Sequence, residues 1–147
     1  MSAIASKKTT EELTKEINFA KNVDDYIHKN KRELSEITLS EYLNKMLAKY
    51  NKTKSEAFKK AGMSDTNYGY EIFRGEKKNV SRDKLIQICI GFPLSYEEVQ
   101  MVLRLGKMSI LYPRNQRDVC IMFALKNGYD LYKLNELLFE HGERVIT

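Results

Sequence analysis

The chain has little of several residue types that mark particular classes of protein. Its 147 residues include no tryptophan and only two cysteines, two histidines and two prolines. Cys89 and Cys120 each lie inside an apolar run with no partner nearby in sequence, so we expect buried, reduced thiols and not a disulfide or a metal site. His28 and His141 lack a neighbouring Cys or His at ligand spacing, which predicts no metal centre.

Long hydrophobic segments are also missing. No apolar run approaches the roughly 20 residues that a membrane-spanning helix needs. Residues 1–10 are polar and carry Lys7 and Lys8 with no apolar stretch behind them, a pattern unlike that of a signal peptide. We therefore expect a cytoplasmic protein.

Catalytic motifs are absent from the sequence as well. It contains no Gly-rich phosphate loop, no metal-ligand cluster, and no Ser or Cys with a His partner at a recognisable spacing. The paired carboxylates Glu11–Glu12 and Glu97–Glu98 fall in predicted first helical turns, where they favour the helix dipole. We expect neither enzymatic activity nor a cofactor.

Positive charge is present, and it is concentrated in the middle of the chain. The formal net charge is +5, and residues 36–91 hold eleven Lys/Arg against seven Asp/Glu, whereas residues 92–147 hold seven of each. A basic middle is typical of a face that binds a polyanion. A solvated surface would have the same composition, so charge alone leaves both interpretations open.

Helical periodicity runs along most of the chain, and strand signals are nearly absent, which predicts an all-α fold. Residues 10–29 should form one helix, or two with a break near Asn22. Thr38, Thr53 and Ser95 each precede a Glu by three residues and should form capping boxes. The apolar run 85–90 indicates a central, buried helix. We expect an N-terminal helical arm (1–35), a helical domain (36–105) and two C-terminal helices (106–147) packed on that domain.

Residues 53–75 have the pattern of two short helices joined at a glycine. Gly62 should end the first helix in the left-handed conformation, which glycine adopts without steric cost. Ser64 or Asp65 should cap the second helix, which carries Tyr68 and Ile72. Two such helices form a helix-turn-helix.

The order of motifs in this part of the chain resembles a known family. Thr53-Lys-Ser-Glu-Ala-Phe-Lys-Lys-Ala-Gly62-Met-Ser is followed by Tyr-Glu-Ile-Phe-Arg-Gly75 and by Ser81-Arg-Asp-Lys-Leu. Residues 36–105 thus resemble λ-repressor-like helix-turn-helix domains of the xenobiotic-response-element (XRE) type. Residues 111–118 and the helices after them look like the tail of small standalone bacterial proteins described as transcriptional regulators. The resemblance implies a five-helix domain that binds double-stranded DNA, with a homodimer formed through the arm or the C-terminal helices.

The resemblance also implies which residues contact DNA. In the family, the start of the first helix of the motif approaches phosphates, the start of the second lies in the major groove, and the following loop meets phosphates. An asparagine at the groove suits adenine, and a threonine methyl suits thymine. Lysines in the loop supply the salt-dependent part of affinity. Carried over to this chain, the implied contact residues are Thr53, Lys54, Asp65, Thr66, Asn67, Tyr70, Lys77, Lys78 and Asn79.

Some features of the second helix favour a different function. Gly69 stands where the family usually has a buried aliphatic residue, at a cost of about 1 kcal/mol relative to Ala. Asp65 and Glu71 add negative charge near the groove face. We expect Tyr68 to pack inward and Tyr70 to lie at the rim; if both are exposed, they form a patch that suits a protein partner. The alternative is a helical adaptor that retains the fold and binds protein through this helix or the C-terminal pair.

Overall fold

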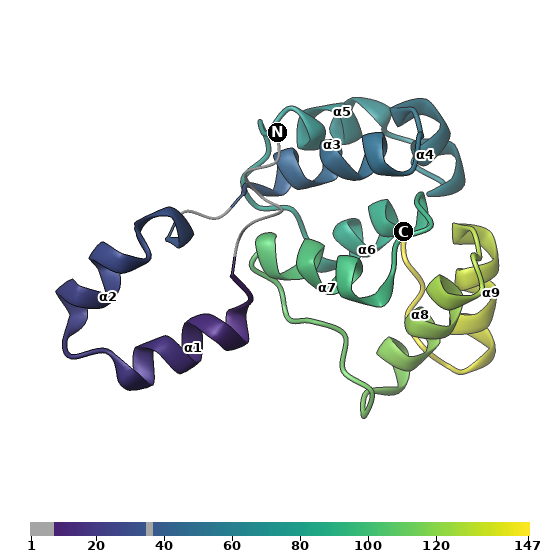
Figure 1. Ribbon diagram of the computed structural model, residues 1–147. Helices are drawn as coiled ribbons and strands as arrows, with labels where there is room; N and C mark the ends of the chain where they lie inside the picture. Colours follow the sequence, from purple (N-terminus) through teal and green to yellow (C-terminus); the bar gives the residue numbers. More distant parts are fainter. Residues whose placement is uncertain (1–7, 35–36) are drawn as a thin grey trace. The chain divides into compact units, whose positions relative to one another are not determined.

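The computed structural model describes residues 8–34 and 37–147, and within these residues the chain is helical with no strand (Figure 1). The predicted all-α fold class is confirmed. The chain divides into two compact units, Met1–Ile37 and Thr38–Thr147. None of the described helices is both long enough and apolar enough to cross a membrane.

The first unit, which we call the N-terminal arm, contains α1 (Thr10–Phe19), α2 (Val23–Lys29) and the short 3-10 helix η2 (Lys31–Glu33). Asn22 caps α2, so the break between the helices lies where the sequence predicts it. Neither helix contains a buried residue. The buried polar residue of the arm is Asn30, which accepts a hydrogen bond from Lys8 Nζ (2.7 Å) and donates one to Glu16 Oε1 (3.0 Å). The described part of the arm is therefore held by polar contacts and not by an apolar core.

The second unit, which we call the helical body, contains seven helices. α3 packs on α5 and α7, α4 on α5 and α6, α6 on α7, α7 on α8, and α8 on α9. In Figure 1, α3, α4 and α5 form a layer over α6 and α7, and α8 and α9 lie side by side near the C-terminus. The helices are α3 (Leu39–Lys49), α4 (Lys54–Lys60), α5 (Thr66–Phe73), α6 (Arg82–Ile90), α7 (Tyr96–Leu105), α8 (Gln116–Lys126) and α9 (Leu131–Glu140).

Buried apolar side chains from all seven helices form the core of this body. Residues 85–90 of α6 are all buried, which confirms the central helix predicted from the apolar run. The three predicted capping boxes, at Thr38, Thr53 and Ser95, are present. Cys89 and Cys120 are buried free thiols, as expected.

Two crossed ion pairs connect the start of α6 to the start of α8. Arg82 donates to both carboxylate oxygens of Asp118 (3.0 and 2.9 Å), and Arg117 donates to both oxygens of Asp83 (2.9 and 3.0 Å). Burial raises the pKa of Asp83, but the hydrogen bonds and charge of Arg117 outweigh it, so this pKa lies below its ordinary value. Each residue of the dipeptide Arg82–Asp83 thus pairs with a residue of the dipeptide Arg117–Asp118, and these contacts fix α8 on the core.

Candidate nucleic-acid interface

α4 and α5 are joined by a short turn that the core holds in place. Gly62 has a φ of 63°, so it occupies the left-handed region as predicted. Asp65, and not Ser64, caps α5, because its Oδ1 accepts a hydrogen bond from the backbone N–H of Tyr68 (3.1 Å). From α6, the amide of Gln87 donates to the carbonyl of Ala61 (3.0 Å). The orientation of α5 relative to α4 is therefore set by buried contacts.

The glycine inside α5 allows a close approach between the two helices. A Cβ atom added at Gly69 would lie 2.7 Å from Cζ of Phe58, which is closer than non-bonded carbons tolerate. The ring of Phe58, which is 2% exposed, fills the space that an aliphatic side chain on α5 would otherwise take. The structure thus gives a packing reason for a glycine at position 69.

The two tyrosines of α5 are both half-buried and both pack against the core, as predicted for Tyr68 but not for Tyr70. Tyr70, expected at the rim, packs edge-on against Phe58, with ring centroids 5.0 Å apart and an interplanar angle of 90°. Tyr68 packs against the core as expected, and its ring also lies beneath the ammonium groups of Lys77 (5.2 Å from the ring centroid) and Lys84 (5.6 Å). The packing of Tyr70 was not predicted because residue spacing within α5 does not show where the ring of Phe58, on another helix, will lie.

Lysines lie on both flanks of α5. Residues two apart in an α-helix point about 200° apart, so Tyr68 and Tyr70 mark opposite flanks. Lys54, from the first turn of α4, lies 5.9 Å from the ring centroid of Tyr70, while Lys77 and Lys84 cover Tyr68. Contacts of this kind hold an ammonium group over an aromatic face. The exposed face of α5 is therefore bordered by positive charge on each side.

The exposed face itself is polar. Thr66 and Asn67, in the first turn of α5, are exposed, and their side chains make no hydrogen bond with the described part of the chain. Asn67 is followed at helical spacing by Glu71 and Arg74, which share its face. An asparagine amide offers a donor and an acceptor together, the combination that reads a base edge.

The acidic groups near this face are engaged by neighbouring groups. The carboxylate of Asp65 serves as the cap of α5. Glu71 lies 3.5 Å from Lys77 Nζ. Glu76 accepts two hydrogen bonds from Arg74 (2.8 and 3.1 Å), and these bonds lower the pKa of its carboxyl group. The carboxylates near this face are therefore either paired with a basic side chain or used to cap a helix.

The nine predicted contact residues lie on three segments: α4 and its N-cap, α5 and its N-cap, and the loop before α6. Thr53 is exposed, but its hydroxyl oxygen already accepts the capping hydrogen bond of Glu56 N–H (3.1 Å). In the loop, Lys77, Lys78 and Asn79 are all exposed, and Lys77 also contacts Glu71 and the ring of Tyr68. Lys84 of α6 lies on the same flank of α5, 5.6 Å from the ring centroid of Tyr68, and is not among the nine predicted residues because it belongs to another helix. No pattern in the sequence links it to Tyr68.

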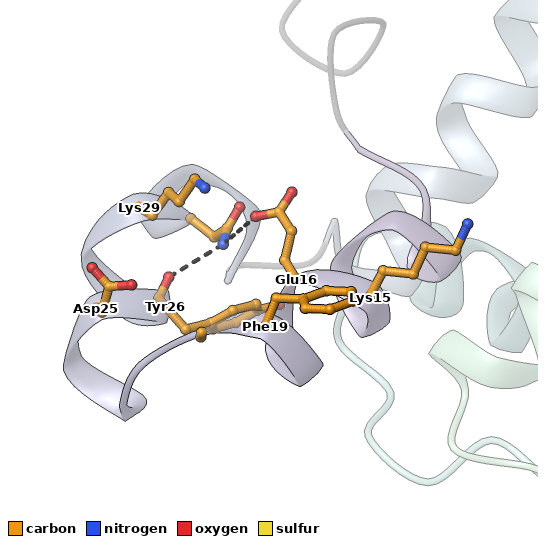
Figure 2. A pocket seen from close by; sticks show the side chains of 8 residues that line it. Lys15, Glu16, Phe19, Asp25, Tyr26 and Lys29 are labelled. Atoms are coloured by element: carbon orange, nitrogen blue, oxygen red, sulfur yellow. Dashed lines mark hydrogen bonds between the residues drawn. The ribbon is translucent and has the colours of Figure 1, made fainter.

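A small hollow lies within the N-terminal arm, between α1 and α2 (Figure 2). Its volume is about 180 Å³, smaller than the roughly 300 Å³ or more typical of ligand pockets. The side-chain amide of Asn30 donates to Glu16 Oε1 (3.0 Å) and to the carbonyl of Tyr26 (3.3 Å), and dashed lines mark these bonds in Figure 2. Among the described residues, no group of three or more His, Cys, Asp or Glu side chains is placed to hold a metal ion.

Comparison with known proteins gives no match: no family model, no curated protein and no solved structure matches this chain. The resemblance of residues 36–105 to λ-repressor-like domains, including the five-helix arrangement, therefore stays a prediction that rests on the motifs themselves.

Proposed function

We propose that the helical body binds double-stranded DNA through α5 and that the protein acts as a transcriptional regulator of the XRE helix-turn-helix type. The observation that carries this proposal is the polar face of α5, with exposed Thr66 and Asn67, bordered by Lys54 on one flank and by Lys77 and Lys84 on the other. A helix in the major groove is flanked by two phosphate strands. Positive charge on both flanks suits that environment.

In this mechanism, the lysines supply affinity and α5 supplies sequence preference. Lys54 on one flank, Lys77 on the other and Lys78 in the exposed loop would neutralise phosphates and release counterions. The Asn67 amide would contact adenine, and the Thr66 methyl would contact thymine. Glu71 lies on the same face, and its carboxylate would accept a hydrogen bond from the amino group of cytosine where the DNA has that base. At other bases its negative charge would repel the DNA phosphates.

The proposal is tested by fluorescence anisotropy with a labelled random duplex at several salt concentrations. We expect wild-type affinity to fall steeply between about 50 and 200 mM salt. Replacing Lys77 and Lys78 together by alanine should reduce the slope of log K against log salt by about 0.9 for each phosphate that the variant no longer neutralises. The matched control replaces Lys126 and Lys133, two exposed lysines of the C-terminal helices, and should leave the slope unchanged. The absence of duplex binding by the wild type even at low salt would refute the proposal.

Two further variants separate charge from base recognition. Glu71→Gln removes a negative charge from the face and should strengthen binding to random duplex. Asn67→Ala should leave random-duplex binding unchanged but reduce preference for the best sequence from a genomic-fragment selection, by about 1–3 kcal/mol. If Asn67→Ala lowers affinity equally for all sequences, α5 does not read bases.

A second candidate function is a protein-interaction adaptor, and the N-terminal arm favours it. The two arm helices bury no residue, and large apolar side chains of the arm are exposed, among them Phe19 (87%) and Val23 (72%). Exposed apolar surface of this kind marks contacts with another protein or with a second copy of the chain. Light scattering after gel filtration tests self-association: replacing Phe19 and Val23 by Ser should dissociate a homodimer. An unchanged mass would exclude the arm as the dimer surface.

A further inference from the structure

An apolar groove lies in the helical body, away from α5, between the start of α7 and the side of α8. Its volume is about 510 Å³, within the range of roughly 300–1,000 Å³ that small-molecule sites occupy. Two of its lining residues belong to the core, since Leu94 is 7% exposed and Leu111 is 1% exposed. The groove is therefore a hollow that reaches the core and not a flat patch. Its apolar and aromatic lining includes Pro93, Leu94, Tyr96, Leu111, Met122 and Leu125.

The groove contains one charged residue in its lining, Lys126 of α8. Its ammonium group lies 5.9 Å from the ring centroid of Phe123, and no ion pair engages it within residues 8–34 and 37–147. The carboxylate of Glu98, whose backbone N–H donates to Ser95, is held by Lys49 and Tyr50 and makes no ion pair with Lys126. The lining thus combines a large apolar surface with a single positive charge.

We propose that this groove binds a small amphipathic molecule with an apolar body and one anionic group, such as a carboxylate or sulfonate. The apolar body would lie on Leu94, Leu111 and Met122, where its transfer from water supplies most of the affinity. The anionic group would pair with Lys126. A second polar contact is available from the Ser95 hydroxyl, whose oxygen accepts a hydrogen bond from Glu98 N–H (3.2 Å) and whose proton remains free to donate.

The dimensions of the groove favour a small molecule over a protein. A stable protein interface buries at least about 1,000 Å² with good complementarity, which a hollow of this size does not provide alone. The proposal is independent of DNA binding, because none of the groove residues belongs to α4, α5 or the loop before α6.

The test compares two fluorescent probes that differ in charge: anilinonaphthalene sulfonate and its neutral analogue phenylnaphthylamine. We expect the wild type to bind each at one site. Lys126→Gln should weaken sulfonate binding about fivefold, the effect of one exposed ion pair, and leave phenylnaphthylamine binding unchanged. The matched control is Lys133→Gln, since Lys133 is another exposed lysine over an aromatic ring (Tyr129, 5.1 Å), and it should change neither.

Filling the groove should remove both probes. Met122→Trp adds a large side chain to the lining, and we expect it to abolish binding while circular dichroism shows a folded protein. Should this variant fail to fold, amide chemical shifts of the wild type with the sulfonate probe decide the question, and the largest changes should fall at Tyr96, Leu125 and Gly128. Equal effects of Lys126→Gln and Lys133→Gln, or shifts elsewhere, would overturn the proposal. So would probe binding that appears only when a homodimer is diluted to monomers, because a second copy would then cover the groove.

Discussion

Removing one charge from the crossed ion pairs between α6 and α8 should lower the free energy of unfolding of the helical body. Asp118 accepts three hydrogen bonds, two from Arg82 and one from the backbone N–H of Tyr112 (3.0 Å), and its side chain is 6% exposed. Asp118→Asn keeps the shape of the side chain but removes its charge. An amide has only one acceptor oxygen, so the NH₂ group of the asparagine would face a donor of Arg82 or Tyr112 and leave that donor without an acceptor.

The size of the effect follows from burial. Removing one partner of a buried ion pair costs about 3–5 kcal/mol. The loss should be smaller here because the Arg82 side chain is 22% exposed and still donates to the carbonyls of Ser109 (2.8 Å) and Ile110 (3.1 Å). We expect the free energy of unfolding to fall by about 2–3 kcal/mol, which lowers Tm by roughly 5–10 °C for a chain of this length.

Thermal and urea unfolding followed by circular dichroism measure this loss, with Glu76→Gln as the matched control. Glu76 likewise accepts two hydrogen bonds from Arg74, but the two side chains are 55% and 51% exposed. Glu76→Gln should therefore leave the free energy of unfolding unchanged within experimental error. Replacing both members by apolar residues, Arg82→Met with Asp118→Leu, should cost less than Asp118→Asn alone, because no buried charge is left unpaired. Equal shifts for Asp118→Asn and Glu76→Gln would refute the reasoning.

Three further predictions follow from packing and from the directions of the pKa shifts. Gly69→Ala should destabilise by about 1–2 kcal/mol in urea unfolding, since overpacking against Phe58 exceeds the gain of about 1 kcal/mol in helix propensity; a stabilised variant would contradict this. Burial raises the pKa of Glu98, but hydrogen bonds from Lys49 and other neighbours outweigh it, so its pKa lies below 4.5 in the folded protein. Ionised Glu98 therefore stabilises the folded protein fully above pH 4.5, and this stabilisation is lost as the pH falls through the pKa of Glu98 in the folded state. Glu98→Gln should therefore reduce the loss of free energy of unfolding at acidic pH, and an unchanged pH dependence would contradict this. Burial raises the pKa of the Cys89 thiol, so an aromatic disulfide reagent should label Cys89 at the rate of unfolding, and rapid labelling of the native protein would show otherwise.

Local signals in the sequence predicted the helices well because helix ends depend on neighbouring residues. The pairs Thr38–Glu41, Thr53–Glu56 and Ser95–Glu98 form the expected capping boxes, since both partners lie within one turn. Gly62 adopts the predicted positive φ for the same local reason. The apolar run of α6 correctly predicted a central helix.

The candidate interface could be predicted only in part. The sequence placed Thr66 and Asn67 at the start of a helix, and in the structure both are exposed there. It did not predict that Tyr70 packs against Phe58 of α4 or that Lys84 of α6 covers the ring of Tyr68. Side chains from other helices set these contacts, and their approach depends on how the helices pack.

The sequence by itself determined the helix boundaries, the caps, the buried cysteines and the basic middle of the chain, all of which depend on contacts within a few residues or on composition. Only the tertiary structure decided which charges are paired, why α5 contains a glycine, and where an apolar groove opens between α7 and α8. Arg82 and Asp118 are 36 residues apart in the sequence, and the groove residues Leu94 and Met122 are 28 residues apart. Such partners meet only when burial of the shared core brings their helices together, so no local pattern records them.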